Sequence, residues 1–222
     1  MFEARTTRFE EALGAEHPAT LTSRNNLAVA YEVAGRTAEA ITLHERNLPA
    51  MERVQGKEHL DTLFCRNNLA NAYHEAGRAE EAIALHEETL EVRERVFGAE
   101  NLHTLASRSN LAAAHNAAGH AEEALTLHEK NLPVHVRVLG AEHPHTLISR
   151  NGLANAYHAA GRTEEAIVLH EQNLPAMEWV QGAEHPDTLK SRKNLAIAYR
   201  AAGREADAER LMAGRDEDGN LG

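Results

Sequence analysis

Histidine gives this 222-residue chain most of its potential for chemistry, because fifteen histidines are present. Imidazole binds transition metals, transfers protons and changes its charge between about pH 5 and 8. Protonating all fifteen side chains would change the formal net charge from -11 to +4. Metal binding, proton transfer and pH-dependent stability or association are therefore the functions to weigh for these residues.

The spacing of the histidines argues against metal binding. Four recur every 42 residues within similar sequence and would occupy one position in successive helix pairs, about 10 Å apart, which is too far to share a Zn²⁺ ion with bonds near 2.0–2.1 Å. These are His44, His86, His128 and His170. Burial in place of an aromatic residue explains them better. Four more precede a predicted helix and fit N-cap or turn positions, with Asn101 in the remaining copy: His17, His59, His143 and His185. No cysteine or carboxylate cluster joins His143 and His145, so no metal or other cofactor is predicted.

Sequence motifs for catalysis are missing. The chain has no GxxxxGKS phosphate loop, no GxSxG and no HExxH. The single cysteine, Cys65, excludes an intramolecular disulfide, fits a reducing compartment and is interpreted as a small buried apolar residue. Pairs such as Glu80 and Glu81 recur with the repeat and indicate a solvated face. We therefore expect a protein that is not an enzyme.

An internal repeat organises all of these residues. Two series of five glycines are each spaced by 42 residues: Gly14, Gly56, Gly98, Gly140 and Gly182, and Gly35, Gly77, Gly119, Gly161 and Gly203. Each copy reads as two helices. Leu27, Ala28 and Tyr31 share one face of the first helix, which ends at Gly35, and the second helix opens after Arg36. One hairpin cannot bury both of its faces, so neighbouring hairpins must stack.

The predicted organisation is an all-α solenoid. Residues 1–14 align with part of a second helix, residues 15–212 form five hairpins, and residues 213–222 form a polar, frayed tail. Pro18, Pro144 and Pro186 fit first helical positions. Three other prolines fall inside second helices, where we expect a kink or break at a cost of about 3 kcal/mol each: Pro49, Pro133 and Pro175.

The pattern NNLAVAYEVAGRTAEAITLHERNL resembles the tetratricopeptide repeat, in particular the 42-residue variety of kinesin light chains. The similarity recurs in five copies and covers about nine-tenths of the chain. It implies a right-handed superhelix, and it implies that groove-facing asparagines of the first helices contact a bound peptide, here Asn25, Asn67 and Asn151. Arg24, in the first helix of the first copy, departs from the family pattern, and so do the arginines at the equivalent positions of the other copies. We expect these arginines to pair with Glu45, Glu87, Glu129 and Glu171.

A stripe on the first helices is the candidate binding surface. With Leu27 and Tyr31 facing the core, a rotation of 100° per residue places Thr22, Asn25, Val29 and Glu32 on the opposite side. The predicted groove comprises Asn25, Val29, Phe64, Asn67, Asn71, His74, Asn116, Asn151, Asn155, His158, Lys190, Lys193 and Arg200. Asparagine both donates and accepts hydrogen bonds and could pair with an extended peptide backbone, although a solvated surface explains the central stripe equally well.

Neighbouring residues have their own alternatives. Asn26, Asn68, Asn110 and Asn194 are interpreted as hydrogen-bonding groups between repeats. Lys190, Lys193 and Arg200 could bind an acidic side chain or a C-terminal carboxylate, but a solvated terminal face is favoured slightly.

The overall charge restricts the partners. An excess of acidic residues, 34 against 23 basic ones, argues against nucleic acid or an anionic membrane, and no apolar run reaches the length of a membrane span. We expect a soluble, cytoplasmic interaction scaffold that binds a protein or peptide in its concave groove. The alternative is a structural repeat that self-associates end to end or spaces other domains. Regulation by pH is a third hypothesis.

Overall fold

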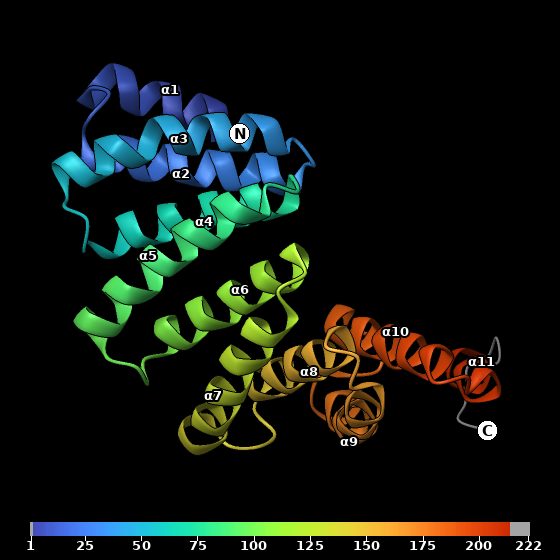
Figure 1. The fold of residues 1–222 in the computed structure, drawn as a ribbon. Coiled ribbons are helices and arrows are strands. Elements are labelled where there is room, and N and C mark those ends of the chain that lie inside the picture. Colours follow the sequence, from blue (N-terminus) through green and yellow to red (C-terminus); the bar gives the residue numbers. More distant parts are fainter. Residues whose placement is uncertain (1, 214–222) are drawn as a thin grey trace. The chain divides into compact units, whose positions relative to one another are not determined.

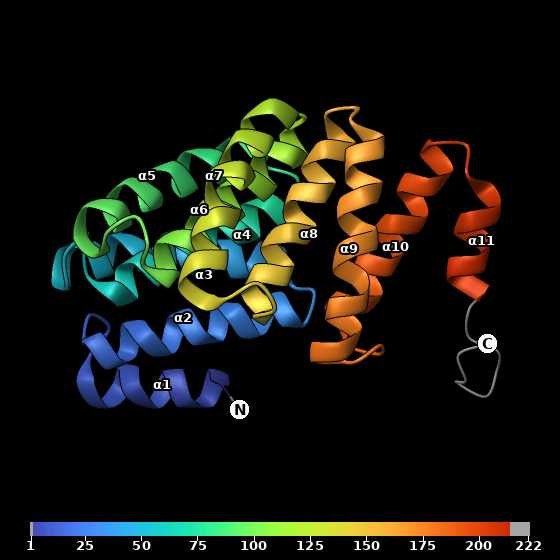
Figure 2. The same ribbon diagram turned by 90° about the horizontal axis from the view of Figure 1, so that it is seen from below.

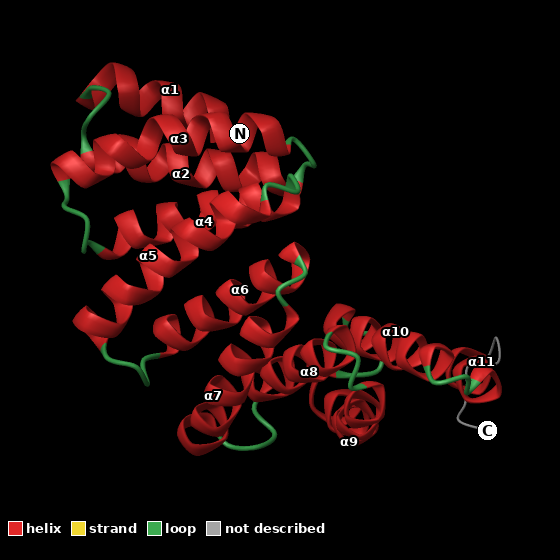
Figure 3. Ribbon diagram, viewed as in Figure 1, coloured by secondary structure: helices red, strands yellow, loops and turns green. Residues whose placement is uncertain are grey.

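The structure is a computed structural model that describes residues 2–213, and all regular secondary structure over this range is helical (Figure 3). The helices are α1 (Phe2–Leu13), α2 (Pro18–Val33), α3 (Thr37–Val54), α4 (Leu60–Glu75), α5 (Ala79–Phe97), α6 (Leu102–Ala118), α7 (Ala121–Leu139), α8 (Pro144–Ala159), α9 (Thr163–Gln181), α10 (Pro186–Ala201) and α11 (Glu205–Ala213). The predicted all-α repeat fold is confirmed. Most of the predicted frayed tail, residues 214–222, lies outside the described residues.

The chain divides into two compact units, residues 1–118 and residues 119–222. In the first unit each helix from α1 to α6 packs against the next, and the first helices α2, α4 and α6 also contact their nearest counterparts (Figure 1). In the second unit α7 to α11 follow one another in the same way, and α8 contacts α10 (Figure 2). Helix order in each unit is thus the order of a stacked hairpin array.

The starts of the first helices follow the N-cap prediction. His17 Nδ1 accepts a hydrogen bond from the Ala19 backbone N–H at 3.2 Å, and His59, His143 and His185 do the same in their repeats. Asn101 Oδ1 accepts from the His103 N–H at 2.9 Å. These bonds satisfy one of the backbone donors that every helix start leaves without a partner.

The turns between the paired helices also repeat. Gly35 has φ +73°, in the left-handed region where a side chain would be strained. This conformation lets the Arg36 N–H donate to the Tyr31 carbonyl at 2.8 Å, which closes the helix end. The Arg36 guanidinium then lies 4.2 Å from the centroid of the Tyr31 ring, a cation–π contact that recurs at Tyr73, Tyr157 and Tyr199.

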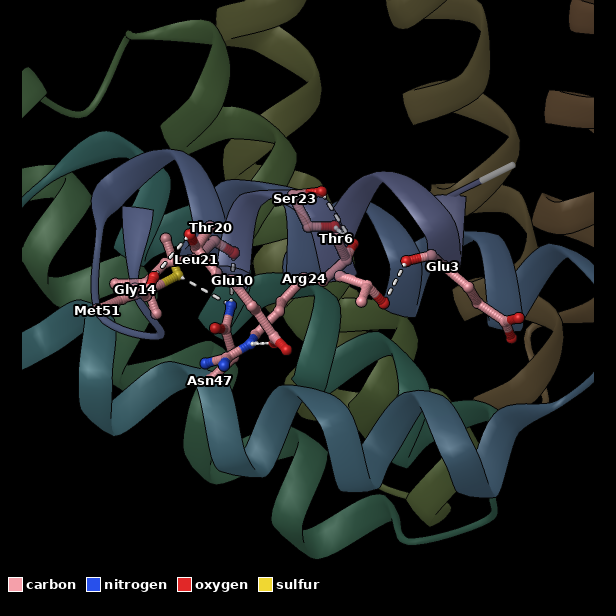
Figure 4. A network of polar contacts seen from close by, with 11 residues as sticks. Glu3, Thr6, Glu10, Gly14, Thr20, Leu21, Ser23, Arg24, Asn47 and Met51 are labelled. Atoms are coloured by element: carbon pink, nitrogen blue, oxygen red, sulfur yellow. Dashed lines mark hydrogen bonds and ion pairs between the residues drawn. The ribbon is translucent and has the colours of Figure 1, made fainter. Parts of the chain in front are cut away.

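The predicted partners of the first-helix arginines are wrong. Arg24 Nε donates to Glu10 of α1 at 2.7 Å (Figure 4). Arg66, Arg108 and Arg192 each pair with the glutamate that lies fourteen residues earlier, namely Glu52, Glu94 and Glu178. The arginine reaches back to the preceding second helix because that helix flanks it in the stack. Glu45, Glu129 and Glu171 instead accept hydrogen bonds from tyrosine hydroxyls of the next repeat.

Helix α1 makes the contacts of a second helix. Its Glu10 pairs with Arg24, and its Glu3 accepts from the Tyr31 hydroxyl at 2.8 Å, as Glu45 accepts from Tyr73. The hydroxyls of Thr6 and Ser23 are 2.9 Å apart in the same interface (Figure 4). Residues 2–13 therefore cover the first hairpin as α3 covers the second.

Of the kink or break predicted at the internal prolines, the break does not occur. Helices α3, α7 and α9 continue across Pro49, Pro133 and Pro175. Helices α7 and α9 have 19 residues, the same length as α5, which has Glu91 at this position. All three proline rings are exposed, so each helix loses one hydrogen bond on its solvent side while its buried face still packs on both neighbours.

Candidate binding surface on the first helices

Residues of the predicted stripe line a polar hollow in the first unit. The hollow has a volume of about 220 Å³ and lies between α2 and α4, and its walls include Thr22, Asn25, Val29 and Phe64. Asp61 adds a carboxylate, which accepts a hydrogen bond from the Thr22 hydroxyl at 3.4 Å. The surface that the helical rotation predicted is thus concave at this place.

A second hollow adjoins the first. It has a volume of about 350 Å³ and shares Asn26 and Val29 with the polar hollow, while Phe2, Ala30 and Val33 supply apolar walls. Val33 is 86% exposed and Phe2 43% exposed, so apolar surface is open to a partner here. A ligand lying along α2 would therefore meet apolar groups first and amide and carboxylate groups next.

The asparagines of adjacent first helices are joined to one another. Asn68 Nδ2 lies 3.5 Å from Asn25 Oδ1, and Asn110 Nδ2 donates to Asn67 Oδ1 at 3.1 Å. The assignment of Asn68 and Asn110 as links between repeats is confirmed by these contacts. These pairs use only the Oδ1 atoms of Asn25 and Asn67, so both half-buried residues keep the two N–H donors of Nδ2 for a ligand.

In the second unit the predicted groove residues differ in burial. Asn151 is only 8% exposed, and its buried Oδ1 has no hydrogen-bond partner in the described structure. Asn155 and His158 are half-buried on α8, whereas Lys190, Lys193 and Arg200 are exposed on α10. Arg200 Nε donates to Glu205 at 3.3 Å, which leaves the two lysines as the cations without an ion pair in this stretch.

Asn71, His74 and Asn116 complete the predicted groove residues, and all three are half-buried. His74 Nδ1 and Asn116 Oδ1 are buried atoms without a hydrogen-bond partner among the described residues. Thus the groove-side polar atoms are sheltered rather than freely solvated at these two positions.

A buried guanidinium lies beneath Phe64, and the sequence analysis did not single it out. Arg93 of α5 is 2% exposed, and its guanidinium carbon lies 5.4 Å from the centroid of the Phe64 ring. Nη1 donates to the Ser107 hydroxyl at 2.6 Å and to the His103 carbonyl at 3.1 Å, but Nε and Nη2 have no partner in the described structure. Burial lowers the pKa of Arg93. The sequence contained a signal for the burial of Arg93, because the same repeat position holds Met51 and Met177 in other copies.

The repeated histidines belong to the core, as predicted. His44 and His170 are fully buried, and His86 and His128 nearly so. Burial lowers the pKa of His86, His128 and His170 to about 4, so the three rings are neutral at pH 7. His128 also explains Gly152, because a Cβ at position 152 would lie 2.6 Å from the His128 ring.

One trio of residues has the composition of a nucleophile, a base and an acid. Cys65 Sγ lies 3.7 Å from His44 Nδ1, and His44 Nε2 lies 3.0 Å from Glu32 Oε1. Cys65 is fully buried, and burial raises the pKa of its thiol to about 12. The thiolate needed for attack is therefore strongly disfavoured, and no substrate can reach the sulfur. The contacts are those of a packed polar core.

Among the described residues, no group of three or more His, Cys, Asp or Glu side chains is placed so that it could hold a metal ion. None of the described helices combines the length and the apolar character needed to span a bilayer.

The repeated caps, the hairpin order and the inter-repeat pairs define a helical-repeat protein of the hairpin-solenoid class. A tetratricopeptide-repeat family model matches residues 26–95, 66–130 and 103–178. The chain belongs to the tetratricopeptide-repeat family. No curated protein matches the sequence significantly.

Solved structures show the same fold. A Podosopora anserina structure, described as a kinesin light chain with nearly identical TPR-like repeats, is 34% identical over 88% of this chain and 92% of its own, with a TM-score of 0.75. BtubC (BKLC) from P. vanneervenii is 21% identical over 94% of this chain and 82% of its own, with a TM-score of 0.70. A Rap protein complexed with Competence and Sporulation Factor is 11% identical over 95% of this chain and 59% of its own, with a TM-score of 0.71.

Proposed function

We propose that this protein is a non-catalytic interaction scaffold whose first helices bind an extended segment of a partner protein. Tetratricopeptide repeats are protein-interaction modules in general, and this chain belongs to that family. The observation that carries the proposal is the pair of adjoining hollows, one between α2 and α4 and one on α1 and α2, which share Asn26 and Val29.

The residues of the two hollows suggest how such a segment is held. Phe2, Ala30 and Val33 offer apolar contact, which drives binding through the area removed from water. The free Nδ2 groups of Asn25 and Asn67 can donate to peptide carbonyls regardless of the ligand's side chains. Backbone contacts give affinity and the apolar hollow gives selectivity, so the expected ligand presents one apolar side chain followed by polar residues.

Blocking the shared wall tests this proposal. Ligands are selected from a random peptide library against the intact chain, and the affinity of the best peptide is measured by calorimetry. Val29→Arg fills both hollows and is expected to weaken binding at least about tenfold, the equivalent of about 1.4 kcal/mol. Thr42→Arg on the exposed side of α3 is the matched control and should leave the affinity unchanged. Equal affinity of the Val29→Arg variant and the wild type, with intact helicity, rules out the groove.

Self-association is the second candidate function. Apolar side chains are exposed near both termini of the described chain, with Phe2 at 43%, Ile197 at 50% and Met212 at 47%. Open ends of a hairpin stack can pair head to tail. Light scattering over a hundredfold concentration range decides between the two. A constant mass near 24.4 kDa supports the open groove, and a mass that rises with concentration supports assembly.

A further inference from the structure

The second helices share one exposed position at which α9 differs from the others. Arg53 of α3 pairs with Glu16, and Arg95 of α5 pairs with Glu58 at 2.6 Å. In both pairs the arginine and the glutamate are more than half exposed. The third copy holds Arg137 at this position, and the fourth holds Trp179. A cation that pairs with a glutamate 37 residues earlier is thus replaced by an aromatic ring.

Trp179 is unusually exposed for its type. It is 86% exposed on α9, and it is the only tryptophan of the chain. Tryptophan is normally well buried, because its ring gains more from leaving water than most side chains do. Nothing in the packing of α9 requires a large ring here, since arginine occupies the same position in its sibling helices.

The replacement also removes the partner of a carboxylate. Glu142 is the repeat equivalent of Glu16 and Glu58, and it has no ion pair or hydrogen bond in the described structure. It lies 37 residues before Trp179, in the exposed turn before α8, within the same compact unit. The repeat geometry that brings Glu16 to Arg53 therefore puts an unpaired carboxylate next to the exposed indole.

We propose that Trp179 and Glu142 form a docking site for a basic side chain, arginine or lysine, of a partner protein. The face of an indole attracts a cation more strongly than any other aromatic side chain does, and a neighbouring carboxylate adds ionic attraction. The partner's cation takes the place that Arg53 and Arg95 occupy in the sibling repeats. This site lies on a second helix and is independent of the proposed groove on the first helices.

The rest of the exposed face of α9 indicates an amphipathic partner segment. Val168, Gln172 and Pro175 precede Trp179 at helical spacing and are all exposed and uncharged. At the position that corresponds to Gln172, helices α3, α5 and α7 carry charged residues: Arg46, Glu88 and Lys130. A net charge of -11 favours approach of a basic partner and disfavours an acidic one. The expected occupant is a basic amphipathic helix.

Intrinsic fluorescence tests the proposal directly, because Trp179 is the sole tryptophan. The intact chain is titrated with an amidated helical peptide of Leu, Ala and Arg, labelled with fluorescein for anisotropy, and with a matched peptide in which each Arg is Glu. We expect the Arg peptide to bind and to shift the Trp179 emission, with affinity that falls as salt is added. Equal binding of both peptides, or binding without a change in emission, overturns the proposal.

Sibling residues supply the variants. Trp179→Arg installs the residue of α3 and α5, so the fold tolerates it, and it should weaken binding about fivefold or more. Glu142→Gln should weaken binding with the ring intact. Arg53→Trp combined with Arg46→Gln reproduces the ring, the pair with Glu16 and the uncharged middle position on α3, and it should raise the stoichiometry from one peptide to two. Binding that is unaffected by Trp179→Arg contradicts the site, and Val29→Arg, which blocks the groove, should leave it intact.

Discussion

At the scale of the residue, the copies of the repeat act as controls for one another. Position 93 shows this most clearly, because Arg93 is buried where two other copies hold Met51 and Met177. Those methionines accept a contact from the buried asparagine four residues earlier, with Nδ2 to Sδ distances of 3.4 Å. Arg93 instead keeps two guanidinium nitrogens without a partner. A buried charge without a carboxylate is retained here at a cost in stability.

Replacement of this arginine should stabilise the protein. Arg93→Met removes an uncompensated buried cation and introduces the apolar residue found at the same position of two sibling repeats. We expect the free energy of unfolding to increase by about 1–3 kcal/mol, as for other buried charges replaced by apolar residues of similar volume. Urea unfolding followed by circular dichroism measures the effect. Loss of stability would show that the cation–π contact with Phe64 and the Ser107 hydrogen bond outweigh the desolvation of the charge.

A second residue-scale prediction concerns Arg150. Fourteen residues before Arg150, where the other copies have the paired glutamate, stands Val136, which is 38% exposed. Arg150 contacts the Asn173 side chain and the Ala141 carbonyl instead. Val136→Glu restores the pair that Arg192 makes with Glu178 and should stabilise the fold by about 1 kcal/mol. Glu178→Val is the reverse control and should destabilise by a similar amount. A stabilisation that persists in an Arg150→Ala background contradicts the pairing.

At the scale of the element, tertiary packing decides whether a helix survives a proline. Helix α9 spans 19 residues with Pro175 and helix α5 spans 19 residues with Glu91, so local propensity does not set the length of either helix. The predicted cost of about 3 kcal/mol applies to proline in an isolated straight helix. Burial of the opposite face against the two neighbouring helices offsets this cost, and that burial is a property of the stack.

Exchanging proline and glutamate at this repeat position measures the free-energy cost of proline inside the helix. Pro175→Glu restores the missing backbone N–H and should raise the free energy of unfolding by about 1–2 kcal/mol, less than the full helix-interior cost because the unfolded chain gains freedom. Glu91→Pro in α5 should lower it. Denaturant unfolding of both variants gives the comparison. A destabilising Pro175→Glu would mean that the backbone of α9 has adapted to the proline.

Helix ends, by contrast, could be predicted from sequence because their determinants are local. His17, Asn101 and Gly35 each act on a backbone group within five residues, so the residue type and its spacing are sufficient. The partners of Arg24 could not be predicted in this way. Glu10 and Glu45 are both glutamates of a second helix, and only the stacking geometry selects Glu10. The exposure of Trp179 likewise emerges only from the packed structure, whereas Met51 and Met177 at the same repeat position already indicated that Arg93 is buried.

At the scale of the whole molecule, the buried histidines make stability depend on pH. Folding lowers the pKa of His86, His128 and His170 to about 4, against 6.5 in the unfolded chain. Between these values the unfolded chain binds protons that the folded chain rejects, so stability is complete above about pH 6.5 and is lost as the pH falls toward 4. The hypothesis of regulation by pH, which was based on the number of histidines, therefore predicts that stability decreases as the pH falls.

Unfolding at several pH values tests this effect. From pH 7.5 to 5.5 most carboxylates stay ionised, and we expect the free energy of unfolding to decrease along this range. The variant His86→Gln, His128→Gln, His170→Gln should show a flatter dependence, whatever its absolute stability. A control with His17→Gln and His185→Gln removes two exposed capping imidazoles and measures how much of the slope comes from outside the core. An equal slope in all three proteins excludes the buried rings as its source.

The constant interval between four of the five first-helix arginines and their glutamates has a genetic consequence. The two residues lie fourteen positions apart, well within a 42-residue period, and the same holds at Glu10, Glu52, Glu94 and Glu178. Duplication or deletion of one period among these four copies therefore reproduces the pair at the new junction, wherever the crossover falls, and Val136 with Arg150 is the exception. Unequal recombination can change the number of copies without creating a mismatched interface, so we expect natural and engineered variants of this array to differ in length by whole repeats.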